Sequence, residues 1–305
     1  MQEFLELLIK ECLPYTQKGK VADYIPELSK TDPAMLGAYI ISSDGKHYFS
    51  GDCMHQFTIQ SVIKTILLLQ ALVDNGIEVV SSKVGVEATG KPFDAINVSE
   101  QKLDSKHLNP MVNMGAIVMC TLIKGSTYEE KFSQILKLTQ KLAGNPDINI
   151  DEAVYLSEKA CGSKNRALAY LLKSNGMLED EVEEVLDCYF RACSISVTCK
   201  DLANIGYVLA NRGRELGSNE RIVPEKYTRY VNAILMTCGM YDGSGEFALR
   251  VGVPAKSGVG GGIMAIAPTK MGIGIYSPSL DEKGNSVAGI QLLEKISQQF
   301  YLSIF

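Results

Sequence analysis

Apolar and polar positions near the N-terminus follow first a helical and then a strand-like period. Apolar side chains recur three and four positions apart over residues 2–14, which predicts an amphipathic helix that ends at Pro14. The next regular stretch, LGAYIISSDGKHYFSGD, predicts a hairpin. Its strands are expected at residues 38–42 and 47–50, with the turn at Asp44 and Gly45.

The middle of the chain has the periodicity of helices. Residues 59 to about 75 form a strongly apolar run that predicts a buried helix. From about residue 109 to 212 most segments repeat with a helical period, for example NMGAIVMCTLIKG and CKDLANIGYVLANRG. Gly176 and Gly213 follow such segments and are typical of helix C-termini.

Short apolar stretches return after Tyr241. GEFALRVGV, GGIMAIAP and KMGIGIYS are punctuated by glycine and proline and predict strands. The last segment predicts a helix that begins at Asn285 or Ser286. Strands at both ends of the chain with helices between them predict one antiparallel sheet, covered by the first and last helices, beside a helical lobe.

The expected fold class is therefore α/β, of the α+β kind, in a single domain over residues 1–305. We expect a sheet subdomain at about 1–58 and 240–305 and a helical subdomain at about 59–239. A hydrophobic content of 46% and a charged content of 21% are typical of a soluble globular protein.

Charge and hydropathy exclude several classes of protein. The net charge is −5 and lysine and arginine are scattered, which argues against nucleic-acid or anionic-membrane partners. No run of 18 apolar residues predicts a membrane span. The N-terminal apolar residues are interrupted by Glu3, Glu6, Lys10 and Glu11, so a signal peptide is not expected, and the predicted location is the cytoplasm.

Cysteine and histidine residues do not form a recognisable metal motif. The eight cysteines include no CxxC pair, which favours reduced thiols packed as small apolar residues. The three histidines, His47, His55 and His107, do not form HExxH. We therefore expect no metal site.

The segment QSVIK contains the first candidate for chemistry. Ser61 and Lys64 are three residues apart, so on a helix they would share a face. The apolar residues around them would lower the lysine pKa, and a neutral lysine can accept the proton of a serine nucleophile. A helix N-terminus also offers free N–H groups for an oxyanion. The alternative is a lysine that reaches solvent beside an incidental serine.

The segment PAKSGVGGGI, residues 254–263, is the second candidate. It fits neither a P-loop, where the lysine follows the glycines, nor GxGxxG, since Ile263 stands where glycine is needed. A tight turn before a strand would also account for it. However, Lys-Ser-Gly before an apolar strand is similar to the KTG element that accompanies SxxK in serine hydrolases. We expect the Lys256 charge to lower the pKa of Lys64 further if the two segments meet.

Nine segments in this order resemble the serine-dependent glutaminases, which have the β-lactamase/transpeptidase-like fold. They extend from Gly19 to Gly289 and depart from the usual family pattern at Ile63, Met114 and Lys164. The segments are GKVADYIPEL, FTIQSVIK, GVEATGKPF, NPMVNMGAI, SEKACGSKNRALA, YFRACSI, MYDGSGEFA, PAKSGVGGGI and SPSLDEKGNSVAG.

The resemblance implies a role for each site residue. Ser61 is the implied nucleophile, Lys64 the general base and Tyr189 a proton relay, while the Ser61 and Val259 N–H groups form the oxyanion hole. The other implied substrate-binding residues are Tyr24, Asn113, Glu158, Asn165 and Tyr241, and the implied site-lining residues are Gln60, Lys256, Ser257 and Gly258.

The implied reaction is hydrolysis of L-glutamine to L-glutamate and ammonia through an acyl-enzyme, in a homodimer or homotetramer. The resemblance implies no metal and no organic cofactor. The side-chain chemistry agrees, because Glu158 can bind an α-ammonium and the Asn and Tyr side chains can donate to an α-carboxylate. Two alternatives are another SxxK acyl hydrolase, such as a β-lactamase or peptidase, and a non-catalytic amino-acid-binding protein.

Overall fold

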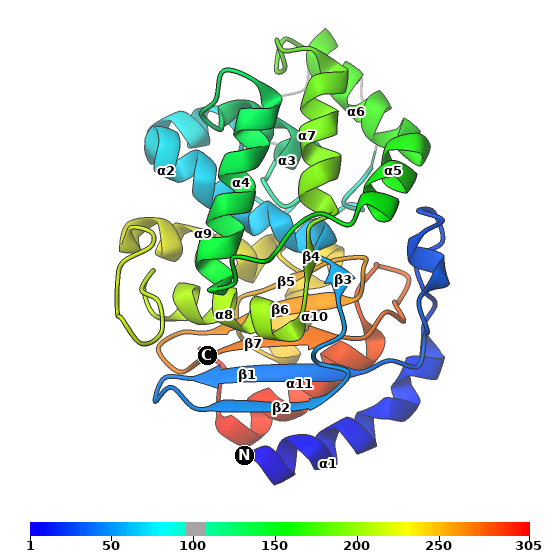
Figure 1. Cartoon of the computed structure of the whole chain (residues 1–305), viewed down its shortest axis with the longest axis vertical. Coiled ribbons are helices and arrows are strands. Elements are labelled where there is room, and N and C mark those ends of the chain that lie inside the picture. Colours follow the sequence, from blue (N-terminus) through cyan, green and yellow to red (C-terminus); the bar gives the residue numbers. More distant parts are fainter. Residues whose placement is uncertain (96–107) are drawn as a thin grey trace.

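A five-stranded antiparallel sheet occupies one end of the molecule (Figure 1). The computed structural model describes residues 1–95 and 108–305, so that His107 lies outside the described residues. The strand order is β2-β1-β7-β6-β5, which brings the N-terminal hairpin beside the C-terminal strands as expected. The strands are β1 (Gly37–Ser42), β2 (His47–Gly51), β5 (Ala255–Ser257), β6 (Gly262–Ala267) and β7 (Met271–Tyr276).

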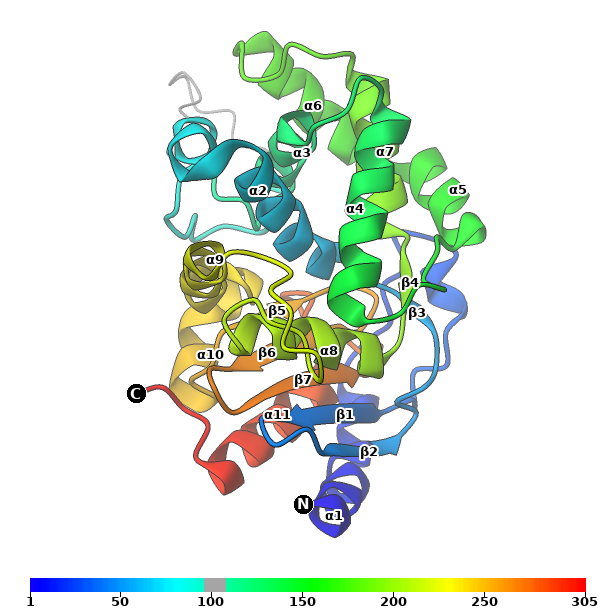
Figure 2. The same ribbon diagram turned by 60° about the vertical axis from the view of Figure 1, so that its left-hand side comes forward.

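Helices cover both faces of this sheet (Figure 2). The terminal helices α1 (Gln2–Cys12) and α11 (Val287–Phe300) share one core with Ile40 and Ile273, which confirms the expected packing. α8 (Cys199–Ala210) lies on the other face, although it belongs to the middle of the sequence. α8 comes close because β7 has glycine there: a Cβ at Gly274 would lie 2.0 Å from the Cys199 carbonyl oxygen.

Most of the remaining helices form a lobe above the sheet (Figure 1). α2 contains Gly76 with φ +81°, so its first regular stretch ends at Asn75, as the apolar pattern predicts. The short strands β3 and β4 pair at the base of the lobe. The ranges are α2 (Ile63–Lys83), α3 (Asn113–Leu122), α4 (Tyr128–Ala143), α5 (Glu152–Cys161), α6 (Ser163–Ser174), α7 (Val182–Cys193), α9 (Glu225–Cys238), β3 (Phe57–Thr58) and β4 (Ser196–Val197).

One predicted strand is wrong. GEFALRVGV contains the helix α10 (Ser244–Arg250) instead. Phe247 and Val251 are four residues apart and both are buried, which is the spacing of a helix face. The sequence alternates too weakly there to specify a strand. Other local predictions are confirmed, since Gly176 and Gly213 have positive φ values and the Ser286 side chain caps α11.

Candidate active site

Ser61 and Lys64 lie where a short 3-10 helix, Gln60–Val62, leads directly into α2. Residues three apart in a 3-10 turn stand one above the other, so the two side chains share a side of the chain. Lys64 is fully buried and Ser61 is 6% exposed. The Lys64 side chain therefore does not reach solvent.

The Lys64 amine is held by two acceptors. Its Nζ donates to Asn113 Oδ1 over 2.7 Å and to the Met111 carbonyl over 3.3 Å. Burial lowers the pKa of Lys64 to about 8. A neutral amine has two N–H groups and one lone pair. Because both N–H groups are engaged by these acceptors, the lone pair of the neutral amine is left to accept a proton.

Asn113, the first residue of α3, connects Lys64 to other predicted site residues. Its Nδ2 donates to Asn165 Oδ1 over 2.8 Å, and the Tyr189 hydroxyl lies 3.5 Å from its Oδ1. Asn165 comes from α6 and Tyr189 from α7. Tyr189 thus reaches Lys64 through Asn113, and its part as a proton relay stays a prediction.

A pocket opens in front of this group, between the lobe and the 3-10 helix. Eight of the predicted residues line it: Tyr24, Gln60, Ser61, Asn113, Glu158, Asn165, Tyr189 and Val259. Lys64 and Tyr241 are buried and do not line this pocket. Lys256, Ser257 and Gly258 do not line it either, and they are buried on β5 and the loop that follows it.

Several residues that line the pocket were not predicted. Phe93, Asp94, Cys161, Lys164 and Cys193 belong to this group. Lys164 and Asp94 form an ion pair of 2.5 Å. Their segments, GKPF and SKNRALA, carry the family resemblance, but a side chain's direction is set by the packing of its helix or loop and cannot be read from the segment.

Glu158 is a buried carboxylate that lines the pocket. It is 5% exposed and accepts a long hydrogen bond, 3.4 Å, from Gln60 Nε2. Burial raises its pKa to about 8, against the opposing effects of Gln60 and of the Lys64 charge. Gln60 is held with φ +44°, an unfavourable backbone conformation of the kind found at functional sites.

Tyr241 and Lys256 form the buried wall beside Ser61. Burial raises the pKa of the Tyr241 phenol, and the neighbouring Ser61 hydroxyl acts in the opposite direction. Tyr241 also has a positive φ, +56°. Lys256 Nζ lies 4.2 Å from the centre of the Tyr241 ring and donates to the Gly239 and Ser257 carbonyls.

The expected effect of Lys256 on Lys64 is not what this geometry favours. Burial, and then the Lys64 charge, lowers the pKa of Lys256 well below its ordinary value. The Lys64 charge thus acts on the pKa of Lys256, whereas Lys256 is not among the groups that shift the pKa of Lys64. Burial and not Lys256 is the cause of the lowered Lys64 pKa.

The glycine loop after β5 packs directly against the start of the nucleophile segment. A Cβ at Gly258 would lie 2.8 Å from the Ile59 carbonyl oxygen and 3.4 Å from the Ser61 nitrogen. The Val259 N–H has no backbone acceptor within the described parts of the chain. Ser61 is in the first turn of its helix, where N–H groups lack intrahelical partners. These two N–H groups can serve an oxyanion.

Residues 1–95 and 108–305 contain no group of three or more His, Cys, Asp or Glu side chains that could hold a metal ion. Among the helices described, none has the length and apolar character to cross a membrane. All eight cysteines are free.

The fold and site define an enzyme of the β-lactamase-like class. The chain belongs to the glutaminase family, since the model of that family, described as "Glutaminase", matches residues 19–305. The chain is 52% identical to a glutaminase of Clostridium tetani and 51% identical to glutaminase 2 of Clostridium perfringens, over the full length of each protein.

Solved structures of glutaminases have the same fold as this chain. A probable glutaminase from Bacillus subtilis complexed with 6-diazo-5-oxo-L-norleucine has a TM-score of 0.91 and 38% identity, over 100% of this chain and 97% of that one. A Bacillus subtilis glutaminase in covalent complex with 5-oxo-L-norleucine has a TM-score of 0.91 and 37% identity, over 100% and 99%. The predicted family and fold are thereby confirmed.

Proposed function

We propose that this glutaminase hydrolyses the side-chain amide of L-glutamine through an acyl-enzyme on Ser61. The observation that carries the proposal is the buried Lys64 amine, whose two N–H groups are engaged and whose lone pair remains. A solvated lysine of ordinary pKa is neutral in fewer than about one molecule in a thousand at pH 7, whereas a pKa of about 8 leaves about a tenth of Lys64 neutral and able to take the serine proton.

The chemical steps follow from this placement. Lys64 takes the Ser61 proton as the serine oxygen attacks the amide carbon, and the Ser61 and Val259 N–H groups stabilise the oxyanion. The proton then passes to the amide nitrogen, the C–N bond breaks and ammonia leaves. Water, deprotonated by Lys64, attacks the acyl carbon, the bond to the Ser61 oxygen breaks, and Lys64 returns the proton to Ser61 as L-glutamate is released. Tyr241 and Tyr189 lie close enough to this group to assist proton movement.

The rest of the pocket suits the amino-acid end of glutamine. The Glu158 carboxylate is a partner for the α-ammonium, and its burial strengthens that attraction. Asn113, Asn165 and Tyr24 supply polar groups for the α-carboxylate. A bound glutamine analogue in the Bacillus subtilis relative supports this choice of substrate.

The test is glutamate and ammonia release by the purified wild type and by Ser61→Ala. Wild-type release that is lost in Ser61→Ala supports the proposal, whereas equal release by both proteins contradicts it. A parallel assay with nitrocefin distinguishes the alternative of a β-lactamase. Turnover of either substrate excludes a non-catalytic binding protein.

Location and assembly are part of the proposal. We infer a cytoplasmic protein because the eight free cysteines, of which seven are buried, suit a reducing compartment. We infer a homodimer or homotetramer from the family resemblance. Light scattering on the purified protein would measure the assembly, and a monomeric mass would contradict it.

A further inference from the structure

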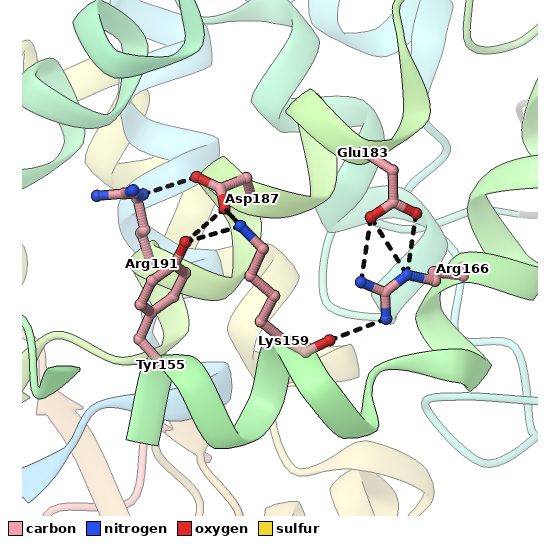
Figure 3. A network of polar contacts seen from close by, with 6 residues as sticks. All are labelled: Tyr155, Lys159, Arg166, Glu183, Asp187 and Arg191. Carbon is pink, nitrogen blue, oxygen red and sulfur yellow. Dashed lines mark hydrogen bonds and ion pairs between the residues drawn. The ribbon is translucent and has the colours of Figure 1, made fainter. Parts of the chain in front are cut away.

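A polar network joins the helices that carry the pocket residues (Figure 3). The Asp187 carboxylate, on α7, accepts from the Tyr155 hydroxyl and from Lys159 Nζ, both on α5. It also accepts from Arg191 Nε over 2.7 Å, one turn further along α7. We call these four side chains the α5–α7 clamp.

Arg166 extends the connection to α6. Its Nε and Nη2 donate to the two carboxylate oxygens of Glu183 over 2.9 and 3.1 Å, the fork geometry that suits arginine. Its Nη1 donates to the Lys159 carbonyl over 2.9 Å. One guanidinium therefore holds α6 to both α7 and α5 (Figure 3).

Each of these helices presents a pocket residue beside a residue of the network. Lys159 directly follows Glu158 on α5, and Arg166 directly follows Asn165 on α6. On α7, Asp187 and Arg191 share one face, being four residues apart. Tyr189 is two residues from Asp187, about 200° around the helix, and so faces the pocket. Any rotation of these helices would move the pocket residues with them.

Glu158 depends on its helix for its position. Within the described residues its carboxylate accepts a single hydrogen bond, the long one from Gln60. A side chain held so loosely by its immediate neighbours is aimed mainly by the backbone that carries it. Clamping α5 to α7 on the outer side fixes that backbone.

We infer that Lys159, Asp187 and Arg166 are positioning residues that hold Glu158 and Asn165 in place to recognise the amino-acid end of the substrate. This inference rests on the proposed function. The ion pairs are partly exposed: the Asp187 side chain is 21% exposed and the Lys159 side chain 44%. Such pairs contribute little to the free energy of unfolding. Their effect is expected in specificity, because small displacements of a binding group are costly.

The experiment compares kcat/KM for L-glutamine with kcat/KM for 4-carbamoylbutanoate, which has the same amide but no α-amino group. Asp187→Asn and Lys159→Met each break the clamp but change the local charge in opposite directions. We expect both variants to lower the ratio of kcat/KM for L-glutamine to kcat/KM for 4-carbamoylbutanoate about ten-fold, mainly through a higher KM for glutamine. A purely electrostatic effect on the substrate ammonium would raise this ratio in one variant and lower it in the other.

Matched controls come from α10 and α11. The Arg250–Glu294 pair has similar exposure, 31% and 22%, and lies on the sheet side, away from the pocket. Glu294→Gln and Arg250→Met should leave the ratio unchanged. Melting temperatures measured for all variants show whether a loss of folding contributes, and Arg166→Gln is the variant of choice if the α5 or α7 variants unfold.

Each outcome has one meaning. A ten-fold lower ratio in both clamp variants, or in Arg166→Gln, with unchanged controls supports the inference. An unchanged ratio, opposite changes in the two clamp variants, or the same decrease in the controls overturns it while leaving the proposed function intact. A wild type that releases no glutamate overturns the proposed function itself.

Discussion

Glutamine binding should release a proton from Glu158. Burial raises the pKa of this carboxyl to about 8, yet only its ionised form can pair with an α-ammonium. At pH 7 only about a tenth of the free enzyme has Glu158 ionised, and at pH 6 about a hundredth. Since the apparent Kd scales inversely with the competent fraction, it should fall about nine-fold between pH 6 and 7 and about five-fold between pH 7 and 8.

Titration calorimetry on Ser61→Ala measures this binding without turnover. Heats measured at pH 7 in buffers of different ionisation enthalpy give the number of protons released, which should include about 0.9 from Glu158. Glu158→Gln in the same background should abolish that part. It should also weaken binding at pH 8 by roughly 10- to 100-fold, the effect of losing a charge-assisted hydrogen bond.

Lys64 titrates in the same range, so the comparison of the two proteins is what matters. A Glu158→Gln protein that releases as many protons and keeps the same pH dependence of Kd would refute the reasoning. Glu158 would then not be the group that meets the α-ammonium.

Four further predictions concern the catalytic group. Lys64→Met should lower kcat on the order of 10³-fold or more without unfolding. The double variant with Ser61→Ala should lose scarcely more activity than either single variant, because the two residues act as a unit. The acidic limb of wild-type kcat/KM, which reports the free enzyme, should include the Lys64 pKa of about 8, and Lys256→Met should leave that limb in place. A shift of half a pH unit or more would mean that Lys256 is charged there. Gly258→Ala should lower kcat at least ten-fold while the circular dichroism spectrum stays native, because the added Cβ would push the glycine loop away from Ser61. Full activity in this variant would mean that the loop does not form the oxyanion hole. Tyr241→Phe should lower kcat more than it raises KM, since its hydroxyl lies beside Ser61, and an effect on KM alone would assign it to binding.

Periodicity was sufficient for most of the fold. The hairpin, the terminal helices and strands β6 and β7 were predictable because each buries alternate or helically spaced apolar residues. GEFALRVGV was not, because its one helical contact face, Phe247 with Val251, is too short to stand out. The packing of α8 on the sheet was also beyond the pattern, since it depends on glycines of β7 that are distant in sequence.

The site was predictable as residue types but not as geometry. The spacing of Ser61 and Lys64 suggested their pairing, whereas the acceptors that hold the Lys64 amine come from the segment around Asn113, far along the chain. The Lys164–Asp94 pair and the α5–α7 clamp likewise depend on how separate helices and loops meet. Such long-range contacts leave no periodic signal in the sequence.

The central claim is that Ser61 is the nucleophile, and covalent labelling tests it most directly. The diazo ketone 6-diazo-5-oxo-L-norleucine loses N₂ as a nucleophile's oxygen or sulfur bonds to its terminal carbon. After incubation and proteolysis, mass spectrometry should find one adduct, on Ser61, and none in Ser61→Ala. Two thiols, Cys161 and Cys193, line the same pocket and are alternative nucleophiles for the diazo ketone. An adduct on either cysteine with Ser61 unmodified would contradict the account.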